Sequence, residues 1–253
     1  MIPNIIHFIF GLEKDFGAKP FSIFHFLAVK SAFVVNKPDK IFLYYKFEPE
    51  GFWWDKARDF ITPVKISVPR TIFKNKLYHY AHKADVLRLK ILLKYGGIYL
   101  DIDTLCIKPF TPLLKNKCVM GEENYLSQEY GLCNAVILAE QNSKFLRHWL
   151  NTYKIFRSKG RDKYWAEHSV IVPLELAKFY PGLIQIEQET SFFYPSYKVK
   201  DLELLFDKCE EFPDAYIFHL WESLSYDKYL TKLTEEILQS QKYIVQSDCK
   251  KIP

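Results

Sequence analysis

The sequence has 253 residues, of which 49% are hydrophobic and 17% aromatic, which excludes an intrinsically disordered chain and allows one large domain or two small ones. The net charge of +5 comes from scattered basic residues, and without a basic stripe a nucleic-acid-binding protein is not expected. No run of about 18 apolar residues occurs, so the sequence predicts no membrane-spanning helix.

The cysteines and the first residues bear on the cellular compartment. Five cysteines lie far apart and no pair has metal-knuckle spacing, which favours reduced thiols that fill the core. The start "MIPNIIHFIFG" lacks a basic region and is interrupted by His7, so a buried strand is expected there rather than a signal peptide. These features, with the absence of an Asn-x-Ser/Thr sequon, predict a cytoplasmic protein and leave peripheral membrane association open.

Strand and helix patterns alternate along the chain. The expected elements are a strand at 4–10, a helix at 21–36, strands at 40–47 and 62–69, a helix at 77–95, and strands at 97–103, 118–124 and 133–140. This alternation predicts one α/β domain with a mostly parallel sheet covered by helices on both faces. An amphipathic helix and a basic tail are expected from about Leu230.

Two aspartates, Asp101 and Asp103, stand where the strand at 97–103 should finish. In an extended strand they would share one face with Tyr99. Two carboxylates on one side repel each other unless water solvates them or a cation lies between them. Ligands bind at this end of open α/β sheets, and Mn²⁺ or Mg²⁺ accepts a small number of protein oxygens. An Asp-x-Asp pair alone is more often a solvated surface feature, so the neighbouring sequence must show whether this pair binds a metal.

The preceding helix carries Asp85 and Arg88, which are three residues apart and therefore lie on the same face. One interpretation is a surface ion pair worth less than about 1 kcal/mol. However, the glycine pair Gly96–Gly97 turns the helix back onto the strand, so both side chains can approach the crevice beside Asp101. An acid for sugar hydroxyls, a guanidinium for phosphate and a metal site together favour binding of a sugar nucleotide.

Three segments resemble the Asp-x-Asp glycosyltransferases of the GT-A fold: "IPNIIHFIFG", "HKADVLRLKILLKYGGIYLDIDT" and "FHLWESLS". The chain is most similar to glycosyltransferase family 32 and more distantly to the catalytic domains of large glucosylating toxins. The resemblance implies a single GT-A domain over 1–253, with a donor and metal half at about 1–140 and an acceptor half with a closing segment at about 141–253. A Gly-Pro that many relatives carry is replaced here by "AEHSVIVPLEL".

The resemblance also implies residue roles in the donor half. Phe10 takes the place of an aromatic residue against the nucleotide base. Asp85 and Arg88 match residues that hold the donor sugar and its phosphate, and Tyr99 and Asp101 lie where ribose and sugar are gripped. Asp103 matches the direct metal ligand. The implied catalytic residues are Asp85, Arg88, Asp101 and Asp103.

Further roles are implied nearer the C-terminus. His219 joins Asp101 and Asp103 as an implied ligand of Mn²⁺ or Mg²⁺, and Trp221 closes over the diphosphate. Asn134 is implied to reach the donor sugar or the acceptor, although a capped turn explains it equally well. One residue of the run Glu122, Glu123 and Asn124 is a candidate for contact with the acceptor.

The implied function is metal-dependent transfer of a hexose, with retention of configuration, in surface polysaccharide or oligosaccharide synthesis. The donor is a nucleotide-sugar, with UDP-sugar favoured over GDP-sugar, and the acceptor is a glycan or glycolipid. Two alternatives remain open. One is an inactive carbohydrate-binding or scaffold protein of the same fold. The other is a haloacid-dehalogenase-like phosphatase, although Thr104 comes one position too early for that motif. No nucleophile–histidine pair is visible, so a covalent intermediate is not expected.

Overall fold

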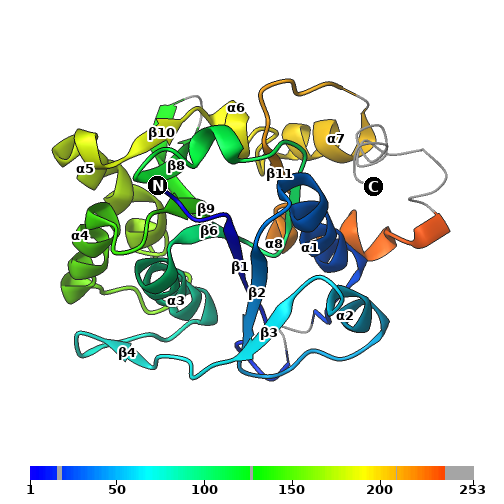
Figure 1. Cartoon of the computed structure of the whole chain (residues 1–253), viewed down its shortest axis with the longest axis horizontal. Helices are drawn as coiled ribbons and strands as arrows, with labels where there is room; N and C mark the ends of the chain where they lie inside the picture. Colours follow the sequence, from blue (N-terminus) through cyan, green and yellow to red (C-terminus); the bar gives the residue numbers. More distant parts are fainter. Residues whose placement is uncertain (16–18, 126–127, 209, 237–253) are drawn as a thin grey trace.

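The computed structural model describes residues 1–15, 19–125, 128–208 and 210–236 (Figure 1). Its centre is a seven-stranded sheet in the order β10-β8-β9-β6-β1-β2-β3. The strands are β1 (Ile5–Ile9), β2 (Lys40–Tyr45), β3 (Thr62–Lys65), β6 (Gly97–Leu100), β8 (Cys118–Tyr125), β9 (Gln128–Ala139) and β10 (Gln185–Glu187). Two smaller sheets pair β7 (Thr104–Cys106) with β11 (Ile217–His219), and β4 (Thr71–Ile72) with β5 (Asn75–Lys76).

Helices cover both faces of the sheet, and none within the described residues is long and apolar enough to cross a membrane (Figure 1). They are α1 (Ile23–Asn36), α2 (Phe52–Ala57), α3 (Tyr80–Tyr95), α4 (Lys144–Thr152), α5 (Val172–Phe179), α6 (Glu189–Phe192), α7 (Val199–Asp207) and α8 (Glu222–Ser225). Because strand side chains alternate, Ile98 and Leu100 join the core beneath α1, whereas Tyr99 joins the core beneath α3.

The sheet is mixed but mostly parallel, as predicted. The pairs β1–β2, β2–β3, β1–β6 and β8–β10 are parallel, and β9 runs antiparallel to both β6 and β8. β9 enters antiparallel because it follows β8 after a short connection, which cannot make the crossover that parallel strands need.

The predicted strand at 97–103 is shorter than expected. It ends at Leu100, and Asp101 to Asp103 form a turn in which the backbone N–H and hydroxyl of Thr104 donate to the Asp101 carbonyl at 3.2 and 2.8 Å. The expectation that Asp101 and Asp103 share a face by strand alternation was therefore wrong. The turn redirects the chain away from the large sheet and into β7, which pairs with β11.

Other boundaries differ slightly from the predictions. The helix predicted at 77–95 begins at Tyr80 because the His79 side chain accepts the Ala81 N–H and caps it. The strand predicted at 62–69 ends at Lys65. Where a C-terminal helix was expected, Leu230–Lys232 forms a 3₁₀ turn, and the part of that prediction beyond residue 236 lies outside the described residues.

The connection between α3 and β6 depends on glycine. Gly96 and Gly97 have φ angles of 65° and 105°, which side chains rarely tolerate. A Cβ atom at Gly97 would lie 2.4 Å from the Ile5 carbonyl oxygen and 2.9 Å from His7 Nε2. The imidazole of His7 in turn bonds the Gly96 carbonyl at 2.9 Å. The end of α3 is thus held directly against β1, and this contact sets the position of Asp85 and Arg88 above the sheet.

We expect Gly97→Ala to lower the free energy of unfolding by about 3 kcal/mol or more, because backbone strain and a clash with β1 add together. Urea unfolding of the purified protein measures the change. Gly160→Ala is the matched control, since Gly160 has a φ of 137° but no atom within 4 Å of the added Cβ. Equal losses in the two variants would show that strain alone acts and that close packing of the turn is unimportant.

Candidate functional site

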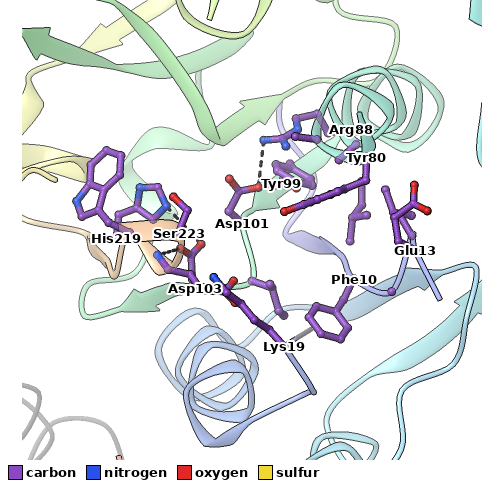
Figure 2. A pocket seen from close by; sticks show the side chains of 18 residues that line it. Phe10, Glu13, Lys19, Tyr80, Arg88, Tyr99, Asp101, Asp103, His219 and Ser223 are labelled. Carbon is purple, nitrogen blue, oxygen red and sulfur yellow. Dashed lines mark hydrogen bonds and ion pairs between the residues drawn. The ribbon is translucent and has the colours of Figure 1, made fainter. Parts of the chain in front are cut away.

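A cavity of about 360 Å³ opens beside the Asp-x-Asp turn (Figure 2). Its walls come from the end of β1, the first three turns of α3, the turn after β6, and the segment that joins β11 to α8. Seven residues singled out from the sequence line it: Phe10, Arg88, Tyr99, Asp101, Asp103, His219 and Trp221. Side chains that are more than 100 residues apart in sequence therefore face one space, at the strand ends where ligands bind in α/β sheets.

Arg88 is the best-anchored side chain of the site. Only 5% of its surface is exposed, and its Nη1 atom donates to the Asn134 carbonyl at 2.7 Å. The same nitrogen lies 3.1 Å from Asp101 Oδ1, while Nη2 lies 3.2 Å from Asp85 Oδ1. The guanidinium carbon stands 4.4 Å from the centre of the Tyr99 ring. These partners hold a buried cation and direct its charge at the first aspartate of the motif.

Asp85 and Asn134 lie behind Arg88 and do not line the cavity. Asn134 Nδ2 donates to Asp85 Oδ1 at 2.8 Å, and both side chains are buried. The surface-ion-pair interpretation of Asp85 and Arg88 is therefore wrong, since each residue is only 5% exposed. Asp85 and Asn134 contact Arg88, which lines the cavity, but they do not line the cavity themselves.

Asp101 is bound from two sides. The Tyr99 hydroxyl donates to its Oδ1 at 2.7 Å, and Arg88 approaches the same oxygen. Burial raises the pKa of the Asp101 carboxyl, Arg88 opposes that rise, and the nearby charge of Asp103 adds to it. Tyr99 and Arg88 thus fix one carboxylate oxygen of Asp101, Oδ1.

Asp103 contacts different residues from Asp101: it is bound by His219 and by the backbone of Glu222. Its Oδ2 accepts the Glu222 backbone N–H at 2.8 Å, and its Oδ1 lies 3.3 Å from His219 Nε2. Burial alone would raise the pKa of Asp103, but His219 and the Glu222 N–H outweigh it and lower the pKa to about 2. Burial would likewise lower the pKa of His219, yet Asp103 raises it above its usual value.

These shifts fix the pH window in which the ion pair stabilises the metal-free protein. The lowered pKa of Asp103 contributes stability above about pH 4 that is lost as the pH falls toward 2. The raised pKa of His219 contributes stability below about pH 6.5 that is lost as the pH rises through the folded-state value. The pair therefore contributes most between about pH 4 and 6.5.

The same three side chains fit a divalent cation. Asp101, Asp103 and His219 each offer one ligand atom, and these atoms all lie within 4.8 Å of one another. Two carboxylate oxygens and one imidazole nitrogen suit Mn²⁺, and a small number of protein ligands leaves positions for substrate oxygens. Among the described residues, no other cluster of three or more His, Cys, Asp or Glu side chains meets this geometry.

Trp221 is close to His219 but is not aligned with it in an extended strand. β11 ends at His219, and Trp221 adopts a left-handed conformation with a φ of 53°. Its ring lies 4.0 Å from that of His219, centroid to centroid. Its indole N–H donates to the Pro195 carbonyl at 3.1 Å, so this group is engaged within the protein. The ring therefore forms a wall of the cavity beside His219.

Other lining residues were not singled out from the sequence. Tyr80 and Phe10 lie on opposite walls, on the side of the cavity away from His219 (Figure 2). The Glu222 carboxylate lies 3.8 Å from Lys19 Nζ and joins the chain before α1 to the C-terminal segment. Tyr80 could have been found from its position, since it precedes Ala84 and Arg88 by one and two helical turns.

The run Glu122, Glu123 and Asn124 lies near the end of β8 and does not line the cavity. Asn124 donates through its backbone N–H and its side chain to Glu189 at 3.2 and 3.0 Å, which anchors α6. Glu123 is buried, and burial raises the pKa of its carboxyl. The role of one of these residues toward an acceptor stays a prediction.

Comparison with known proteins gives a family and a fold. The model of the "glycosyltransferase sugar-binding region containing DXD motif" matches residues 24–120. Glucan organizing enzyme 1 of Cryptococcus neoformans is 35% identical over 252 residues, covering 94% of this chain and 67% of the relative. An uncharacterized Arabidopsis thaliana protein is 35% identical over 95 residues, and that match spans 14% of its length.

Two solved structures share the architecture. GlyE of Streptococcus pneumoniae superposes with a TM-score of 0.53 at 13% identity, over 90% of this chain and 57% of that one. Mouse xyloside xylosyltransferase 1 gives 0.52 at 14% identity, over 88% of this chain and 99% of that one. The fold is thus the GT-A fold of glycosyltransferases, which excludes the haloacid-dehalogenase alternative. With the Asp-x-Asp turn inside the matched region and a relative similar along nearly the whole chain, this protein belongs to the family of glycosyltransferases whose sugar-binding region contains the DXD motif.

Proposed function

We propose that the chain transfers a hexose from a nucleotide-sugar, preferably a UDP-sugar, to a glycan or glycolipid acceptor, and that it requires Mn²⁺ or Mg²⁺. The observation that carries this proposal is the convergence of Asp101, Asp103 and His219 on a cavity whose wall also contains Arg88. Three ligand atoms and a buried guanidinium beside one another match a substrate that carries a diphosphate and a sugar.

The donor is proposed to lie along the cavity. The nucleotide base would occupy the end between Phe10 and Tyr80, whose rings offer stacking surfaces. The diphosphate would lie beside Asp103 and His219. The sugar would meet Asp101 and Arg88, with Asp85 and Asn134 acting through Arg88. Trp221 would cover the diphosphate with its ring, because its N–H already bonds Pro195.

The residues have separate tasks in the transfer. A bound divalent cation would neutralise the charge that develops on the departing diphosphate. Glu222 N–H holds Asp103, and Tyr99 with Arg88 holds Asp101, so both carboxylates are oriented before the donor arrives. We propose retention of configuration, as in family 32. Residues 1–140 would form the donor half and residues 141–253 the acceptor half, and a glycolipid acceptor would place the protein at a membrane surface.

A thermal-shift screen of UDP- and GDP-sugars with Mn²⁺ tests this function. A ligand at 100 times its Kd adds about 2.7 kcal/mol, so one sugar nucleotide should raise the Tm clearly, and only with the metal. Asp103→Asn should abolish both the shift and the transfer, because the amide keeps the shape but loses the charge. The control is Asp207→Asn. Asp207 ends α7 and accepts a hydrogen bond from the Tyr229 hydroxyl, and its loss of charge should leave the thermal shift and the transfer unchanged.

An assay of turnover with the sugar nucleotide found in the screen has three informative outcomes. Mn²⁺-dependent release of nucleotide diphosphate supports a transferase. Binding of sugars without any turnover would favour the inactive carbohydrate-binding protein. Unchanged turnover of Asp103→Asn at saturating Mn²⁺ would refute the metal assignment.

Mn²⁺ affinity should depend on pH through His219. Only the neutral imidazole binds metal, and the raised pKa of His219 makes the proton a competitor above pH 6.5. The affinity should fall about tenfold per pH unit below the folded-state pKa. Isothermal titration between pH 5.5 and 8 measures it. In His219→Gln the slope should flatten, whereas His148→Gln, on the exposed face of α4, should behave as the parent does. A parent affinity that is independent of pH would exclude His219 as a ligand.

Arg88→Lys should reduce kcat/KM at least a hundredfold, equivalent to about 2.7 kcal/mol of transition-state stabilisation. Lysine keeps the charge but has one nitrogen where Arg88 uses two, Nη1 toward Asp101 and Asn134 and Nη2 toward Asp85. Steady-state hydrolysis of the sugar nucleotide found in the screen gives the value. Arg58→Lys is the control, since Arg58 forms an exposed pair with Glu48. Activity near that of the parent would mean that the guanidinium geometry is dispensable.

A further inference from the structure

A buried polar cluster lies behind Arg88, on the side away from the cavity. We call it the α3 polar cluster, and it consists of His82, Tyr153 and His168. Their exposed fractions are 2%, 0% and 2%, and none of them lines the cavity. His82 stands one turn before Asp85 on α3, while Tyr153 follows α4 and His168 lies in the π-helix Glu167–Ile171. The cluster therefore connects α3 to a segment of the C-terminal half.

Ring contacts place the three residues together. The ring centroids of Tyr153 and His168 are 4.8 Å apart. Phe156 lies 5.3 Å from His168 and 5.1 Å from His82, and so joins the two imidazoles. The charge of Asp85 influences the pKa of both Tyr153 and His168. His82 lies one turn before Asp85 on the same helix, so the cluster borders the carboxylate that binds Arg88.

Several buried polar atoms at this place lack hydrogen-bond partners among the described residues. They are Arg88 Nε, His82 Nδ1, Tyr153 Oη and His168 Nδ1. Leaving such an atom unpaired costs about 1–3 kcal/mol, so native proteins rarely do so. Four in one region indicate that a further polar partner is bound there.

The chemistry of the four atoms is complementary. His168 Nε2 lies 3.1 Å from the Thr152 carbonyl and His82 Nε2 lies 3.3 Å from the Trp165 carbonyl. A carbonyl oxygen only accepts, so each Nε2 carries a proton, and in the neutral form of the ring Nδ1 is then the acceptor. Arg88 Nε–H is a donor, and the Tyr153 hydroxyl both donates and accepts. Because each water donates and accepts hydrogen bonds, water molecules are the small partners that satisfy such a set.

The titration states agree with this description. Burial raises the pKa of Tyr153, Asp85 adds to the rise, and Arg88 opposes it, so the phenol keeps its proton. Burial lowers the pKa of His168, which keeps the imidazole neutral. The charged groups beside the cluster are paired ones: Asp85 with Arg88, and Glu167 with Arg157. The Glu167 carboxylate lies 3.6 Å from His168 Nδ1, beyond hydrogen-bond distance.

We propose that internal water, held between the Tyr153 hydroxyl, the two imidazole Nδ1 atoms and Arg88 Nε, sets the orientation of the Arg88 guanidinium beneath Asp101. Tyr153 is then a positioning residue for the donor site, and this inference rests on the proposed function of Arg88 and Asp101. The Nη atoms of Arg88 are bound to Asp85, Asp101 and Asn134 at one edge of the guanidinium. Holding Nε at the other edge fixes the rotation of its plane over Tyr99.

The test compares Tyr153→Phe with Tyr229→Phe in the full chain. Both variants remove one hydroxyl from a buried tyrosine, but Tyr229 bonds Asp207 in a different part of the core. Arginine-selective ¹⁵N NMR of the ligand-free protein follows the Arg88 Nε–H signal, assigned by its loss in Arg88→Lys. We expect solvent exchange of this proton to accelerate at least tenfold in Tyr153→Phe and to stay unchanged in Tyr229→Phe. Unchanged exchange in Tyr153→Phe would overturn the proposal.

Two further measurements separate this inference from the proposed function. In donor hydrolysis, Tyr153→Phe should lose about tenfold in kcat/KM, and Tyr229→Phe should not. If no sugar nucleotide is turned over, the NMR result still decides whether Tyr153 controls Arg88. If Tyr153→Phe does not fold, His168→Gln, which keeps the bond to Thr152 but removes the Nδ1 acceptor, should produce the same acceleration. A high-resolution crystal structure that shows Tyr153 bonded directly to His168, with no water between them and Arg88, would contradict the inference.

Discussion

The burial of Arg88 is the constraint on which the site depends. A guanidinium removed from water must be neutralised and hydrogen-bonded, since the loss of one partner from a buried pair costs about 3–5 kcal/mol. Asp85 comes from the same helix, Asn134 from β9 and Asp101 from the turn after β6. Satisfying one cation therefore fixes three elements relative to one another. The first aspartate of the Asp-x-Asp turn is oriented as a result.

The second aspartate has independent support. Asp103 is held by the backbone N–H of Glu222 and by His219, both from the segment that closes the small sheet β7–β11. Asp101 is thus tied to the large sheet and Asp103 to the C-terminal segment. The two carboxylates that the sequence places side by side belong to different structural units. A cation bound between them would connect the α3 network with the closing segment.

The sequence predicted the order of β1, α1, β2, β3, α3, β6, β8 and β9, because these segments have recognisable apolar patterns. It did not predict short elements such as α2, β4 and β5. It also predicted that Arg88 reaches Asp101, since the glycine turn leaves few other arrangements, but it did not predict that Asp85 lies behind Arg88. It did not predict the end of β6 at Leu100, because Thr104 creates the turn through local hydrogen bonds. Tyr153 and His168 were missed as well. Their relation to α3 arises from packing between distant segments and has no local pattern in the chain.

The pairing of β7 with β11 has a consequence for biosynthesis. Its partners are Thr104 with His219, Leu105 with Phe218 and Cys106 with Ile217, so more than a hundred residues separate the two strands. While a ribosome is still producing the intervening segment, Asp101 and Arg88 can already pair, but Asp103 lacks its imidazole neighbour. The nascent chain would therefore order the Arg88–Asp101 pair before Asp103 gains His219, and the proposed set of metal ligands would be completed later. The proposed metal site would form only when β11 docks against β7.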